Sequence, residues 1–280
     1  MTLATVAAAL LASACTNNDD DFADGRDTET VWLISPTPFS EDDGQVQLDL
    51  IADTFDWPHR TPFEDTFLTG PIEGTGWNTR GYQSPNGDGS LSVSNLNNQW
   101  GYASDAYTAD EYCRATCTPL PFGEEEAIER SRGIFTALGL DPDKFSYRTA
   151  VSTNDEDQAV SILTIASYVV AGKTTSLEWV VGYRNAEGQV DRASGHFVTV
   201  SELGDVPILT PTEALTLAGR EPTTDTLNNT TLTLETQYDR ETNQYILIPV
   251  YSVPVSDNLN TNITITATRT QDIPWPDQDT

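Results

Sequence analysis

Four strand-like segments in succession constrain the fold of this chain more than any other feature. They are rich in β-branched and aromatic residues, as is typical of strands. The turn Asn185-Ala186-Glu187-Gly188 separates the last two, which predicts antiparallel pairing. The segments cover residues 145–152, 159–171, 177–184 and 190–200.

A helix is predicted on each side of these strands. The first covers residues 124–138, where three leading glutamates complement the helix dipole, and Gly139 ends it in a left-handed cap. The second covers Thr212–Leu217, because Thr210-Pro211-Thr212-Glu213 forms a capping box with proline at the first helical position; it stops at Gly219. The order is therefore helix, antiparallel strands, helix.

The preceding region has a similar but weaker pattern. Apolar residues over 46–55 favour a short helix. Residues 76–82 and 91–94 flank a turn that contains Asn-Gly and Asp-Gly, which predicts a β-hairpin, and a further strand is expected around Trp100 and Tyr102.

The C-terminal part alternates apolar and polar residues over 230–265, which predicts three more strands with a polar hairpin turn at Asp239–Asn243. A frayed acidic end with Trp275 as an isolated aromatic follows. The expected fold class is α+β, with antiparallel sheets, a few short helices and a β-rich C-terminal segment. The expected units are residues 45–122, 123–222 and 223–280.

The N-terminus predicts export. The apolar stretch Leu3–Ala14 is too short for a membrane span of roughly 20 residues, and Leu11-Ala12-Ser13-Ala14-Cys15 is typical of a bacterial lipoprotein cleavage box. We expect a signal peptide over 1–14, lipid on Cys15, and a location on the outer face of the cytoplasmic membrane. An ordinary cleavable signal, with Cys15 there by chance, is the alternative. Residues 15–44 are expected to be an acidic disordered tether whose apolar patch, Val31–Ile34, could dock on the body.

Charge and cysteine usage agree with an exported protein. With 43 acidic and 14 basic residues, the net charge of −29 disfavours nucleic acid and anionic headgroups as partners. Cys113 and Cys117 are an even pair in an exported chain, which predicts one disulfide. It would close a small loop, so its stabilisation should lie toward the low end of roughly 2–4 kcal/mol.

Catalytic patterns are missing from the sequence. The two histidines, His59 and His196, have no Gly-x-Ser-x-Gly elbow beside them and too few potential ligands for zinc. The acidic turns do not match the spacing of a calcium-binding loop. With 43 acidic residues in the chain, the presence of two carboxylates that could cleave a glycoside does not indicate a glycosidase. No catalytic residue, metal or cofactor is predicted.

Four aromatic residues fall on neighbouring predicted strands. Trp77, Tyr82, Trp100 and Tyr102 would form a possible ligand-binding face if they shared one side of the sheet. Packing in the core is the more ordinary role for such residues.

Several short segments resemble PepSY-like domains of exported bacterial proteins, and the layout is similar to actinobacterial lipoproteins of unassigned function. The segments are Trp179–Arg184, Gly188–Val190, Ala193–Gly195, Val206–Ile208 and Glu213–Leu215. The resemblance implies PepSY-like α+β units in tandem. It also implies partners among envelope peptidases, which such domains commonly inhibit or chaperone.

The sequence therefore predicts a non-enzymatic, lipid-anchored envelope protein that binds a protein or peptide partner as a regulator, inhibitor or sensor. A wall-glycan-binding module that uses Trp77 and Trp100 is the first alternative. An envelope hydrolase is the weaker one.

Overall fold

The fold was analysed in a computed structural model, which describes residues 27–36, 41–65, 79–85, 89–94, 99–104, 118–184, 187–239, 244–254 and 262–275. Its strands are β1 (Thr28–Pro36), β2 (Thr61–Asp65), β3 (Thr79–Gln83), β4 (Ser90–Ser94), β5 (Gln99–Ala103), β6 (Phe145–Thr153), β7 (Ala159–Val170), β8 (Lys173–Arg184), β9 (Gln189–His196), β10 (Val198–Pro207), β11 (Thr231–Asp239), β12 (Gln244–Pro254) and β13 (Asn262–Thr266). The α-helices are α1 (Glu41–Thr54), α2 (Glu124–Ala137), α3 (Pro211–Leu217) and α4 (Thr224–Asn228).

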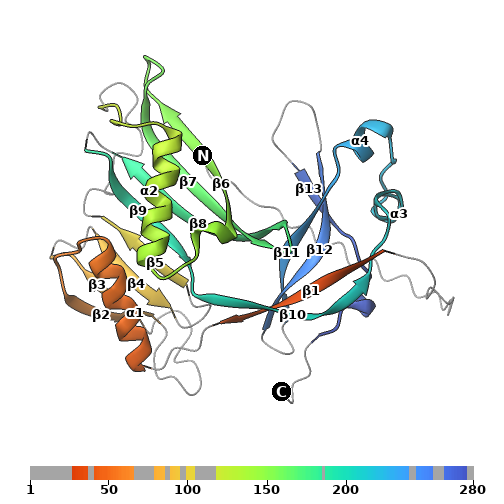
Figure 1. Ribbon diagram of the computed structural model, residues 1–280, viewed down its shortest axis with the longest axis horizontal. Helices are drawn as coiled ribbons and strands as arrows, with labels where there is room; N and C mark the ends of the chain where they lie inside the picture. Colours follow the sequence, from red (N-terminus) through yellow and green to blue (C-terminus); the bar gives the residue numbers. More distant parts are fainter. Residues whose placement is uncertain are drawn as a thin grey trace.

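The described strands form one strongly bent sheet of 13 strands, in the order β10-β1-β12-β11-β8-β9-β5-β4-β3-β2, with β6–β7 added at β8 and β13 at β12. Every pairing is antiparallel except one point of parallel contact between β11 and β8. Helices α1 and α2 lie on one half of the sheet, and α3 and α4 lie at the far end of the other half (Figure 1). The protein is thus mixed α+β with a mostly antiparallel sheet and a few short helices.

Local signals in the sequence are confirmed at several places. Helix α2 begins at Glu124 and is followed by Gly139, whose φ is +76°. Helix α3 has the complete capping box, in which Thr210 and Glu213 each accept from the other's backbone N–H. The hairpins β3–β4 and β11–β12 pair as expected.

The predicted disordered tether over residues 15–44 is wrong for residues 28–36. They form β1, which pairs with β10 along its whole length and with β12 over three residues. Val31 and Leu33 pack in one apolar cluster, while Trp32 and Ile34 pack in another on the opposite face. A strand buried on both faces appears as a continuous apolar run rather than an alternating one, which is why this patch looked like an isolated segment.

The end of the described chain also differs from its prediction. Trp275 is not isolated: it packs against the cluster that contains Val31, Val206 and the buried Ile273. The apolar side chains of β1 on this face pack against the C-terminal segment and hold it on the sheet.

Pro249 lies in the middle of β12, where a proline normally interrupts pairing. Its carbonyl accepts from the N–H of Ala267 at 3.0 Å, so the missing N–H falls on the edge away from β11. On that edge β12 pairs with β1 up to Leu247 and with β13 from Val250. The proline therefore occupies the point where one neighbouring strand replaces another, and no ladder bond is lost.

The two predicted α+β units share a single sheet. Strand β5, from the first unit, pairs with β9, from the second, over five residue pairs. Their helices lie side by side on the sheet (Figure 1), α1 against β3 and β4 and α2 against β6 and β7, and the space between these helices contains the candidate site.

Candidate functional site

A groove of about 680 Å³ lies between the C-terminal end of α1 and the middle of α2. We call it the interhelical groove; its residues are Thr54, Phe55, Asp56, Tyr102, Ser104, Arg130, Gly133, Ile134, Ala137, Tyr183, Glu187, Gly188, Gln189 and Val190. It draws on α1, β5, α2, and the ends of β8 and β9 with the turn that joins them. Its volume lies within the roughly 300–1,000 Å³ of typical ligand sites.

The end of α1 builds one wall. Asp56 adopts a left-handed backbone conformation with φ of +49°, and the N–H of Trp57 donates to the carbonyl of Ala52 at 2.8 Å. This termination directs Phe55 onto Tyr102, where the two rings stack with centroids 4.2 Å apart. Trp57 contacts the same Tyr102 ring edge-on at 5.8 Å, so the aromatic part of the groove is held firmly.

Helix α2 forms the opposite wall and leaves part of it open. A Cβ on Gly133 would meet no atom within 4 Å. Arg130 binds Glu126 at 2.8 Å, and its guanidinium lies 4.1 Å from the centre of the Phe122 ring. These contacts position the Arg130 side chain against the wall, and the groove stays open beside it.

The floor includes Tyr183, which is almost fully buried. Its hydroxyl lies 2.9 Å from Ser131 Oγ, which itself donates to the carbonyl of Ala127 at 2.8 Å; Tyr183 is therefore the donor. Burial raises the pKa of the Tyr183 hydroxyl to about 12. The group stays protonated at neutral pH and serves to fix α2 to the sheet.

The lining of the groove is mixed in polarity. No histidine or cysteine is among its described residues, and Thr54 Oγ1 is engaged by the carbonyl of Leu50 at 2.8 Å. Its lining combines apolar side chains, such as Phe55 and Ile134, with several polar ones, and ligand pockets commonly combine the two kinds.

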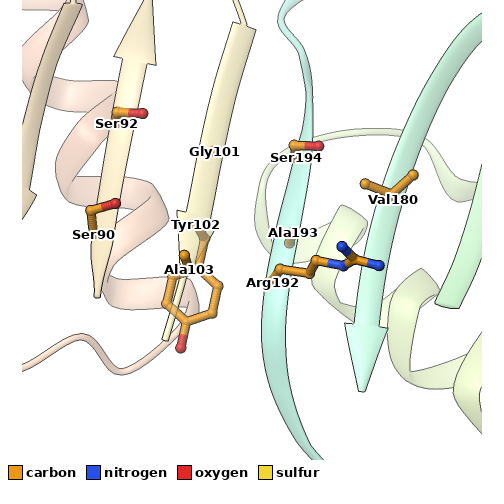
Figure 2. A pocket seen from close by; sticks show the side chains of 9 residues that line it. All are labelled: Ser90, Ser92, Gly101, Tyr102, Ala103, Val180, Arg192, Ala193 and Ser194. Carbon is orange, nitrogen blue, oxygen red and sulfur yellow. The ribbon is translucent and has the colours of Figure 1, made fainter. Parts of the chain in front are cut away.

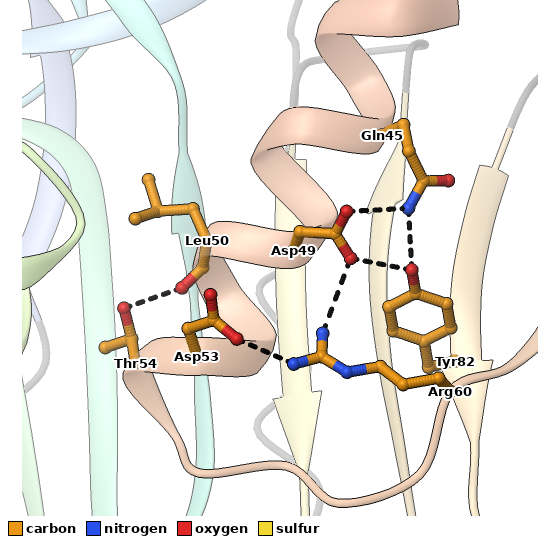
Figure 3. Close-up of polar contacts among 7 residues, drawn as sticks. All are labelled: Gln45, Asp49, Leu50, Asp53, Thr54, Arg60 and Tyr82. Carbon is orange, nitrogen blue, oxygen red and sulfur yellow. Dashed lines mark hydrogen bonds and ion pairs between the residues drawn. The ribbon is translucent and has the colours of Figure 1, made fainter.

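Of the three predicted face residues that the structure describes, only Tyr102 lies in the groove. Trp100, with 1% of its surface exposed, is in the core, and Trp77 lies outside the described residues. Tyr82 donates to Asp49 at 2.7 Å and accepts from Gln45 at 2.6 Å (Figure 3), and burial is the main cause that raises its pKa. Helix α1 covers these aromatics, so a wall glycan cannot stack on Trp100.

The opposite face of the sheet carries a shallower hollow of about 270 Å³. Small side chains on β4, β5 and β9 open it, including Ser92, Gly101 and Ser194, and Arg192 lies at its side (Figure 2). Next to it Asp191 occupies a β-bulge opposite Gly182, and burial raises the pKa of its carboxyl. The hollow is much smaller than the interhelical groove.

The remaining predicted site residues are not placed. Cys15, Cys113 and Cys117 lie outside the described residues. In the described part of the chain, no group of three or more His, Cys, Asp or Glu side chains could hold a metal ion, and no helix is long and apolar enough to cross a membrane.

Comparison with known proteins identifies the fold alone. No family model and no curated protein matches the chain. Among solved structures, the crystal structure of an uncharacterized protein from Eubacterium rectale is similar, with a TM-score of 0.50 and 11% sequence identity. The match covers 90% of this chain and 87% of that one, so the similarity extends over nearly the whole fold rather than over one unit.

Proposed function

We propose that this is a non-enzymatic extracytoplasmic protein, anchored through lipid on Cys15, that binds a segment of a protein partner in the interhelical groove. The single observation that supports binding is the groove itself, which stays open between two helices that both pack closely on the sheet. An aliphatic or aromatic side chain of the partner would lie on the surface made by Phe55, Tyr102 and Ile134. The net charge of −29 favours a cationic partner over an anionic one.

The tandem arrangement of PepSY-like units is part of this proposal. Each unit has one helix followed by antiparallel strands, α1 with β2–β5 and α2 with β6–β9, and both helices contact their own strands. If the resemblance holds, the partner class is an envelope peptidase that the protein inhibits or chaperones. A groove between the two helices would then be a property of the pair that neither unit has alone.

Filling the groove should abolish binding without unfolding the protein. Because a side chain on Gly133 enters open space, Gly133→Trp should fold normally and obstruct the groove. We expect this variant to bind fluorescently labelled hexapeptides with a central phenylalanine or leucine at least tenfold more weakly than the native protein. Fluorescence polarisation with the same labelled peptides would measure the change.

Gly133→Ala is the matched control, because its methyl group leaves the groove open. It should retain peptide affinity and gain up to about 1 kcal/mol in the free energy of unfolding, since alanine is the better helix former. Undiminished affinity of the tryptophan variant would contradict the groove as the binding site, as would the failure of every peptide to bind the native protein.

Lipid attachment has a separate test. Cys15→Ser should move the protein from the membrane fraction to the soluble fraction of cells, because serine cannot accept the lipid thioether. Cys113→Ser, which changes a cysteine assigned to the disulfide, should stay with the membrane. Retention of the Cys15 variant in membranes would disprove the anchor and leave the groove proposal untouched.

A further inference from the structure

Asp56 lies just after α1 and places a carboxylate at the wall of the interhelical groove. It lines the interhelical groove and is exposed. Its φ of +49° lies in the left-handed region, which aspartate and asparagine adopt more readily than other residues with a side chain, and glycine most readily of all. It also follows the C-terminal end of α1, where the helix dipole is negative and an added negative charge is unfavourable.

The usual compensations are missing around Asp56. Helix α1 has no basic residue in its last turn. Arg60, which follows α1 in the chain, forms ion pairs with Asp49 at 3.4 Å and Asp53 at 2.6 Å (Figure 3). Among the described residues no side chain forms an ion pair or hydrogen bond with the Asp56 carboxylate.

Other acidic residues near the groove do form ion pairs with arginines. Asp49 and Asp53 share Arg60, and Glu126, across the groove, holds Arg130 at 2.8 Å. The Asp56 carboxylate therefore has no partner among the described residues, and it lines the same groove as the stacked rings of Phe55 and Tyr102. A charged residue that lines a groove, has no partner among the described residues and lies at the negative end of a helix dipole is a candidate for ligand recognition.

We propose that Asp56 is the specificity-determining residue of the groove and selects partner segments in which a lysine or arginine stands next to the apolar side chain bound on Phe55 and Tyr102. This inference rests on the proposed function, because it assigns the specificity of the same groove. A cation at this position would pair with the carboxylate and would also face the negative end of the α1 dipole. The apolar rings of Phe55 and Tyr102 contribute most of the affinity, and Asp56 determines which partner segments bind best.

Two labelled hexapeptides that differ only in lysine against glutamine beside a central phenylalanine test this proposal. The native protein should prefer the lysine peptide by about fivefold at low salt, and the preference should shrink as salt is added. In Asp56→Asn the preference should disappear while affinity for the glutamine peptide stays the same. Asparagine keeps the shape and tolerates the left-handed conformation, so folding is not at issue.

The outcomes separate the two proposals. If both peptides bind and the asparagine variant still prefers lysine, Asp56 does not determine specificity, although the groove binds. If neither peptide binds, the groove proposal itself has failed. Asp56→Gly should raise the melting temperature, because glycine accepts the left-handed backbone and removes the charge. A lower melting temperature would overturn the argument that the acid is kept at a cost to stability.

Discussion

Replacement of Gly195 by alanine should lower the free energy of unfolding by about 3 kcal/mol or more. The added Cβ would lie 1.8 Å from Cδ1 and 2.4 Å from Nε1 of Trp179, which is far inside contact distance. Overpacking of a core typically costs about 1–3 kcal/mol, and here the tryptophan has little room to move. Its ring is 1% exposed and lies 4.9 Å from the Phe145 ring, and its Nε1 donates to the carbonyl of His196 at 3.1 Å.

Urea unfolding followed by tryptophan fluorescence would measure the loss. Gly133→Ala makes the same chemical change at a site with no neighbour within 4 Å, and it should be neutral or stabilising. Equal stability of the two alanine variants would show that the sheet can shift to admit the methyl group. The tight packing of Gly195 on Trp179 would then not be essential to the fold.

Val31→Asp should have an effect at least as large, because it introduces a carboxylate into β1 at a position with no exposed surface. Burial of an unpaired charge costs several kcal/mol and is among the few changes that unfold a domain. We expect either no folded protein or a loss of more than about 4 kcal/mol, measured by circular dichroism in urea. The comparison residue is Val46 on α1, which is 64% exposed, so Val46→Asp should change stability by less than about 0.5 kcal/mol.

A folded Val31→Asp protein of native stability would mean that β1 contributes little to the sheet. Residues 28–36 would then be dispensable for the body, as the prediction of a tether over residues 15–44 supposed. Equal destabilisation by both substitutions would instead indicate a general intolerance of added negative charge, because the chain already carries −29.

Sequence reasoning succeeded where structure depends on neighbouring residues. The capping box at Thr210 and the left-handed Gly139 are set by contacts within a few positions, and the hairpins are set by their turns. Strand β1 escaped prediction because its partners in β10 and β12 are more than 160 residues away in the chain. Nothing within the four apolar residues Val31–Ile34 specifies those partners.

The candidate site was harder to predict for the same reason. The aromatic residues of β3 and β5 were predicted on neighbouring strands, but β4 lies between these two strands, and only the packing of α1 decides that Trp100 is buried while Tyr102 borders a groove. The groove exists because β5 pairs with β9 and so brings two helices together. Two local signals could have pointed to it: a glycine inside α2 at position 133, and an acid directly after the end of α1 at position 56.

Strand β1 also determines how the protein would respond to mechanical tension. If Cys15 is held by lipid, residues 16–27 connect the anchor to the sheet, and twelve residues span at most about 40 Å. A pull from the membrane would run along β1, and the hydrogen bonds to its antiparallel neighbours lie perpendicular to that direction. They would share the force in shear instead of opening one at a time, so the body would follow the membrane as a single rigid piece with its groove undistorted.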